Sequence, residues 1–256
     1  MGSPSVSITA TEVAGALALV VVAAAVSLWQ RAGLESDLGV AVVRSILQLT
    51  AVGYVIQAIF DSDSLWLTTV LLMAMVAVGT ATARSRARSV PRATLPIAAG
   101  LIVAVATTIG LVVALGVFDP RPRYLIPVGG MMIGNAMTAA AVSLNRLSDE
   151  IAGDAGRIEA TLALGATARQ ATAGLTARSL RSGMIPVIDQ TKTTGLVAFP
   201  GAMVGMLLAG AEPVDAVRLQ VVLLWLLTGS VALSAVIATS LGLRGFFTDA
   251  EQLRER

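Results

Sequence analysis

The sequence contains neither cysteine nor histidine. Without cysteine, the chain can form no disulfide bond, no thiolate nucleophile and no cysteine-ligated zinc or iron–sulfur site. Without histidine, it can form neither a Ser-His-Asp triad nor the H-E-x-x-H zinc motif. It also lacks the G-x-x-x-x-G-K-[ST] loop that cradles ATP phosphates. These absences exclude most familiar enzyme chemistry, so we expect no enzyme activity and no cofactor in this chain.

Charged residues are scarce as well. Only 13% of the 256 residues are charged and 55% are hydrophobic, whereas a soluble globular domain has roughly 25% charged residues. A soluble protein is therefore excluded. A membrane span takes about 20 mostly apolar residues, and seven runs qualify: residues 13–29, 38–60, 65–83, 97–118, 126–144, 184–209 and 219–243. They lack the two-residue alternation of barrel strands, so the sequence predicts an all-α, polytopic membrane bundle of about seven transmembrane helices in a single domain, residues 1–256.

The basic residues are distributed unevenly over the loops between these runs. If the loop with Arg84, Arg86, Arg88 and Arg92 is cytoplasmic, thirteen Lys and Arg residues lie on the cytoplasmic side and three lie outside. Positive residues favour the cytoplasmic side of a membrane. We therefore expect a multi-pass protein of the cell (inner or plasma) membrane, with the N-terminus outside and the C-terminus in the cytoplasm.

One predicted cytoplasmic connection, residues 145–183, is far longer than the others and mixes charges with helix formers, which predicts a helical excursion. Within it, Glu159, Ala160, Gly165 and Ala166 fit a pattern that resembles the coupling segment of ABC-transporter permeases. A short helix ended by a left-handed glycine can present its side chains to a groove on a partner protein. An interfacial amphipathic helix without a partner explains the pattern equally well.

Further segments carry a more specific resemblance. The sequence is similar to the FetB-type permeases over residues 44–49, 126–137, 184–189, 192–197, 200–205 and 208–213, and at Gln220. These permeases are ABC-transporter membrane subunits implicated in metal export, chiefly of iron, with plant relatives linked to aluminium tolerance and nucleotide-sugar transport. Ala202 departs from the pattern, because a methionine is expected after the Pro-Gly pair.

Three charged residues lie within predicted spans: Arg44, Asp189 and Lys192. A charge at mid-membrane costs roughly 2.5 to 3.5 kcal/mol, so these side chains are expected to face the protein interior or water. We expect Asp189 to be charged, buried and paired. Arg44 and Asp189 lie at similar depth and can pair across helices, while Lys192, three residues beyond Asp189, offers an intrahelical pair. Two roles for these charges stay equally open: holding helices together, and acting directly in the gate or translocation path.

Polar amides and helix breakers complete the candidate path. Gln48 shares a helix face with Arg44, and Asn135 lies near the middle of the fifth run; hydrogen bonds between helices are the commoner role of such amides. Pro200 and Gly201 predict a kink or break in the sixth run, which could expose carbonyl groups to a cation or act as a hinge. Three glycines of the fifth run, Gly129, Gly130 and Gly134, are expected to permit close helix packing.

The resemblance implies a membrane permease subunit that exports a metal, chiefly iron, by alternating access. A separate ATPase subunit would bind ATP and Mg²⁺, and two permease chains would pair as a homodimer in the lipid membrane. No nucleic-acid partner is expected, and the metal ligands are not identified by the sequence. The alternatives are an ion-coupled secondary carrier without an ATPase, with Asp189 as coupling site, and an ABC permease for a non-metal substrate such as a nucleotide sugar.

Overall fold

A computed structural model of the chain describes residues 9–254, so Arg256 of the predicted cytoplasmic side lies outside it. The described residues form two compact units. Unit 1 contains α1 (Ala10–Gln30), α2 (Glu35–Ser62) and residues 208–210; unit 2 contains residues 64–207 and 211–254. The organisation of residues 1–256 as a single domain stays a prediction.

Unit 1 is a helical hairpin. The turn between α1 and α2 begins at Arg31, which has a left-handed backbone (φ 54°) and ends α1. Ser27 then ties the turn together, because its Oγ accepts a hydrogen bond from the Leu34 N–H (2.9 Å) and donates one to Glu35 Oε2 (2.9 Å). Most apolar side chains of both helices are exposed in the single chain, as expected of helices that lipid or another polypeptide covers.

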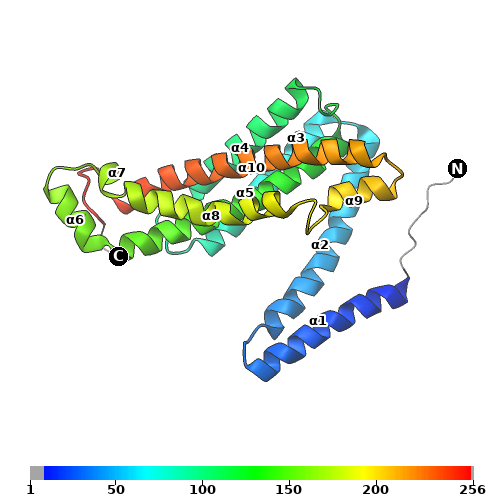
Figure 1. Cartoon of the computed structure of the whole chain (residues 1–256), viewed down its shortest axis with the longest axis horizontal. Helices are drawn as coiled ribbons and strands as arrows, with labels where there is room; N and C mark the ends of the chain where they lie inside the picture. The colour runs from blue at the N-terminus through cyan, green and yellow to red at the C-terminus, as the bar shows by residue number, and fades with distance from the viewer. Residues whose placement is uncertain (1–8, 255–256) are drawn as a thin grey trace. The chain divides into compact units, whose positions relative to one another are not determined.

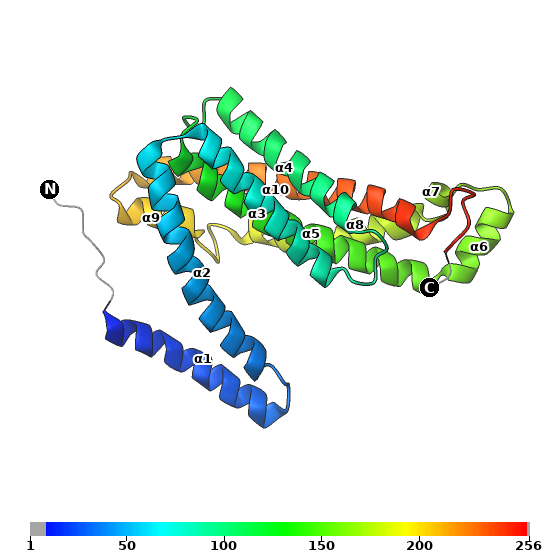
Figure 2. The ribbon, with the colours of Figure 1, turned by 180° about the vertical axis from the view of Figure 1, so that it is seen from behind.

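Unit 2 is a bundle built around a long central helix. Figures 1 and 2 show α3 (Leu65–Arg86), α4 (Thr94–Ala114), α8 (Ala173–Thr193) and α10 (Pro213–Leu243) beside α5 (Pro122–Gly153), and each of them contacts α5. The short helices α6 (Ala155–Ala163) and α7 (Ala168–Ala171) lie at one end, and α9 (Gly201–Leu208) precedes α10 at the other. The turn η1 (Arg244–Phe246) follows α10. Fully buried Leu101, Met132, Leu144 and Leu227 form part of the core.

Small residues let the helices of unit 2 approach closely. A Cβ at Gly183 of α8 would lie 2.7 Å from the carbonyl oxygen of Ala139 in α5 and would also overlap Ser143. Of the three glycines predicted to permit close packing in α5, Gly129 and Gly130 lie against side chains of α3, but Gly134 has open space around it. The prediction is thus confirmed for two of the three.

Six of the predicted spans are confirmed as helices long and apolar enough to cross a membrane: α1 to α5 and α10, among the described residues. The remaining one, the sixth run at residues 184–209, is not one continuous helix. The chain leaves helical geometry after Thr193, turns through residues 194–200 and resumes as α9 at Gly201. The predicted break is confirmed, and it includes the six residues before Pro200 because Gly195 adopts a left-handed backbone (φ 87°).

Candidate functional site

The predicted coupling segment is confirmed as a helix that ends at a left-handed glycine. Gly165 has φ 90°. Its N–H donates to the carbonyl of Leu162 (2.9 Å), and the N–H of Ala166 donates to that of Thr161 (3.3 Å), which is the hydrogen-bond pattern of a Schellman motif. The turn leaves Leu164 at the tip, 89% exposed. The motif therefore presents a corner that protrudes from unit 2.

The corner has one buried side and one open side. Ile158 of α6 is fully buried in the core of unit 2, whereas Glu159 and Ala160 are exposed on the same short helix. After the turn, Thr167 caps α7 by exchanging hydrogen bonds with Gln170. Both predicted coupling side chains of α6 are thus available to a partner protein.

The segment that follows α10 holds this corner in place. Phe246 and Phe247 are buried in the same core as Ile158. Residues 247 and 253 then pair as an antiparallel bridge, and Glu251 Oε2 accepts a hydrogen bond from the N–H of Ala168 at the start of α7 (2.7 Å). Nothing in the sequence pattern of residues 244–254 predicted this role, because the contact joins segments far apart in the chain.

An ionic network joins the end of α5 to the start of α8. Glu150 accepts from Arg146 (2.6 Å) and from Arg178 (2.6 Å), and Arg178 also lies 3.9 Å from Asp154. Glu150 lies beyond Leu144, where the predicted apolar run ends, and the hydrogen bond from Arg178 lowers the pKa of its carboxyl. The two helices that lead from the corner into the bundle are therefore linked at their base.

Helix α8 has a polar face that the other described residues of unit 2 leave exposed. Arg178, Asp189 and Thr193 are exposed and Ser182 is half-buried along one side of the helix. On the opposite side Val187 is buried against the core, so the helix is amphipathic. It is not among the described helices that are apolar enough to span a membrane on their own.

The position of Asp189 corrects one prediction. Its side chain is exposed in the chain, not buried, because the buried side of α8 is the one that carries Gly183 and Val187. Among the described residues, Asp189 and Lys192 form no ion pair with each other. Arg44 and Gln48 are exposed on α2 in the other unit, so the pairing of Arg44 with Asp189 stays a prediction.

The remaining path candidates lie in unit 2. Asn135 donates through Nδ2 to the carbonyl of Met131 one turn earlier in α5 (2.9 Å), so the expected hydrogen bond between helices is replaced by one within its own helix. Pro200 is half-buried and Gly201 exposed at the start of α9.

The structure adds a polar contact that the sequence analysis missed. The hydroxyls of Thr191 in α8 and Thr228 in α10 share a hydrogen bond of 3.1 Å next to the break. The sequence could not identify this pair, because a threonine within an apolar run does not indicate which residue it contacts. Among residues 9–254, no group of three or more Asp or Glu side chains lies together in a way that could hold a metal ion.

Known proteins match the chain over nearly its whole length. The model of the Uncharacterised protein family (UPF0014) matches residues 10–247. The chain is 44% identical to the UPF0014 membrane protein STAR2 of Oryza sativa subsp. japonica, over 94% of this chain and 84% of the rice protein. It is 40% identical to the Protein ALUMINUM SENSITIVE 3 of Arabidopsis thaliana, over 94% and 88% of the two chains. It is 35% identical to the Probable iron export permease protein FetB of Escherichia coli (strain K12), over 96% and 95%. No solved structure matches it.

Proposed function

Because this chain belongs to the UPF0014 family, a family of multi-pass helical membrane proteins, we propose that it is the permease subunit of an ABC transporter. In this proposal it exports a metal ion, iron, across the cell membrane with energy from a separate ATPase subunit. The similarity to a relative named for iron export supports the substrate. The E-A pattern around Glu159 supports the ATPase partner.

The exposed polar face of α8 is the observation that carries the transport function. A charged side chain facing lipid at mid-membrane costs roughly 2.5 to 3.5 kcal/mol. Asp189 lies within the predicted span and is exposed in unit 2, so water or protein outside unit 2 must cover it. A water-filled path lined by α8, in a homodimer of permease chains, meets that requirement. The irregular residues 194–200 fit the same path, because a backbone without helical hydrogen bonds is tolerated at membrane depth where it lines a cavity.

The coupling segment would connect the ATPase subunit mechanically to this path. The exposed tip at Leu164 and the open side of α6 would contact the ATPase, while the ionic network around Glu150 ties the bases of α5 and α8 together. Movement of the corner would therefore displace both helices jointly. Closure of paired ATPase subunits on ATP would rearrange the bundle between two access states.

The test is transport by the chain reconstituted in vesicles with the ATPase that copurifies with it. We expect ATP-dependent movement of Fe²⁺ and a permease-stimulated rate of ATP hydrolysis. Gly165→Pro and Glu159→Lys should lower both rates while the bundle stays folded, since residues 159 and 165 lie on the protruding corner. Asp149→Lys is the matched control, because Asp149 is exposed at the same end of unit 2 but belongs to α5.

Other outcomes would point to the competing functions. Fe²⁺ movement driven by an ion gradient without ATP would identify a secondary carrier. ATP-driven uptake of a nucleotide sugar with no response to metals would identify a different substrate. Unchanged ATP hydrolysis in both corner variants would mean that α6 is an interfacial helix and not a coupling segment.

A further inference from the structure

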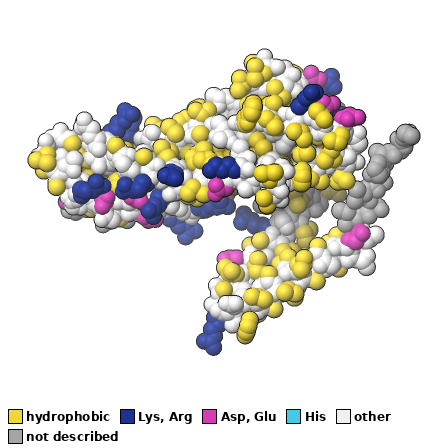
Figure 3. All heavy atoms as spheres, in the orientation of Figure 1, with side chains coloured by type: hydrophobic (Ala, Val, Ile, Leu, Met, Phe, Trp, Pro, Cys, Tyr) yellow, Lys and Arg dark blue, Asp and Glu magenta, His cyan; other side chains and the backbone are white. Residues whose placement is uncertain are grey.

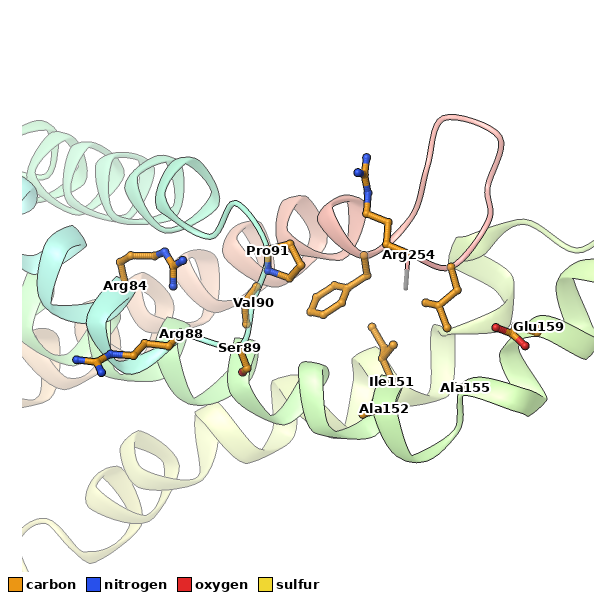
Figure 4. A pocket seen from close by; sticks show the side chains of 12 residues that line it. Arg84, Arg88, Ser89, Val90, Pro91, Ile151, Ala152, Ala155, Glu159 and Arg254 are labelled. Carbon is orange, nitrogen blue, oxygen red and sulfur yellow. The ribbon is translucent and has the colours of Figure 1, made fainter. Parts of the chain in front are cut away.

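A hollow of about 650 Å³ opens at the end of unit 2 where the basic residues gather. Figure 3 shows most Lys and Arg side chains of the visible face over this end. The walls come from three separate parts of the chain: the end of α3 with its loop to α4, the α5–α6 junction, and the segment that follows α10. Figure 4 shows Arg84 and Arg88 together at one end of the hollow and Glu159 at the opposite end.

The three arginines that line the hollow are held by the backbone. Arg84 donates to the carbonyl of Ala87 (2.8 Å), Arg88 to that of Ser85 (3.0 Å) and Arg254 to that of Phe247 (2.9 Å). None of the three forms an ion pair with a described residue. A guanidinium has five N–H donors, so each arginine is fixed by one bond and keeps donors for an anion.

We expect the hollow at the boundary of the membrane, because one of its walls begins where an apolar run ends. The apolar run of α3 ends at Ala83, directly before Arg84, and the loop that follows leads into the next membrane-spanning helix. The lining between the charged ends is largely apolar and includes Val90, Pro91, Ile151 and Phe246. A ligand that suits both features has an anionic group next to an apolar part.

We propose that this hollow binds the phosphate group of an anionic phospholipid from the leaflet that borders it. Arginine matches a phosphate with two parallel hydrogen bonds, and basic pockets between membrane helices are suited to lipid headgroups. The apolar lining and the boundary position favour a lipid over free phosphate, and Glu159 repels the anion toward the arginine end. The site needs only a membrane around the chain, so it is independent of the proposed export function.

The test measures lipid binding by the intact chain, purified in a non-ionic detergent without any ATPase. The probes are dioctanoyl phosphatidylglycerol, dioctanoyl phosphatidylcholine and inorganic phosphate, titrated against the thermal unfolding midpoint. Phosphatidylglycerol should raise the midpoint and the other two should not. Arg84→Gln with Arg88→Gln should weaken phosphatidylglycerol binding about fivefold for each arginine. Arg92→Gln is the control, because it removes the same charge from the same loop but does not line the hollow.

Three results would overturn the proposal: an equal response to phosphatidylcholine, an equal response to inorganic phosphate, or equal weakening by Arg92→Gln. The second would identify a site for free phosphate, and the third would show only a general attraction of the basic end. Because Arg84 also caps the end of α3, the double variant could fail to fold. In that case the single variant Arg88→Gln is the test, and we expect it to weaken phosphatidylglycerol binding about fivefold.

Discussion

Asp189 places a carboxylate on the exposed face of α8, within a span that the sequence predicts. Its chemical type and its place within a predicted span follow from the sequence, and so does the expectation that it does not face lipid. Its exposure in the single chain could not be predicted, because the rotation of α8 is fixed by Gly183 and Val187, which face the core instead. Likewise, the glycine cap at residue 165 followed from the local pattern, whereas the bond from Glu251 to the corner required the tertiary fold.

We expect Asp189→Asn to reduce transport strongly while the thermal unfolding midpoint of the purified chain stays the same. The substitution keeps the shape and removes only a charge that has no ion-pair partner among the described residues. Asp189→Glu should retain part of the activity. A large fall in stability would instead indicate a buried pair, since stranding one member of such a pair costs about 3 to 5 kcal/mol. Combining Asp189→Asn with Arg44→Gln then tests the pairing, because paired residues give non-additive effects.

At the scale of helices, hydropathy predicted α1 to α5 and α10 because each buries or presents one long apolar surface. The sixth run, residues 184–209, was harder to predict, because two halves with different compositions share it. Pro200 and Gly201 indicated a break, but the turn begins at Thr194, where a proline signal is absent and the left-handed Gly195 redirects the chain. The packing partners of α5 were also beyond prediction, since open space beside Gly134 and close contact at Gly129 look alike in sequence.

The contact between α5 and α8 gives a prediction for packing. Gly183→Ala should destabilise the bundle by about 1 to 3 kcal/mol, because the added methyl group would meet the carbonyl of Ala139, and a backbone atom cannot move aside cheaply. Thermal unfolding of the chain in detergent measures the effect. Gly134→Ala, with no atom within 4 Å of the new methyl group, should be neutral or slightly stabilising. Equal effects of the two variants would mean that α5 and α8 are not in close contact.

At the scale of the whole molecule, the uneven distribution of charge is the feature that sequence alone predicted best. The arginines around the α3–α4 loop and those around α6 and α7 are far apart in the chain, yet both groups lie at the same end of unit 2. Successive spans run in opposite directions, so every second loop lies at the same end, and this alone brings the two groups together. That the two groups share one end could be predicted without knowledge of packing, whereas side-chain contacts could not be foreseen.

This distribution predicts the orientation of the chain in the membrane. A reporter that is active only in the cytoplasm should be active when fused after Arg256, because positive residues are retained on that side. The same reporter inserted between α4 and α5, at Gly116, should be inactive. The opposite result for both fusions would invert the topology and place the coupling corner outside, where no ATPase could reach it.

The broken crossing also constrains how the protein is made. With eight residues, α9 is about 12 Å long and cannot traverse a hydrocarbon layer of about 30 Å. Helix α8, which carries Asp189 and Lys192, is too polar to partition from the translocon into lipid unaided. In the folded chain, α8 packs against α5, which is synthesised earlier, and against α10, which is synthesised later. We therefore expect residues 173–208 to stay at the bilayer surface until α10 has emerged, so that the helices insert in an order different from that of the sequence.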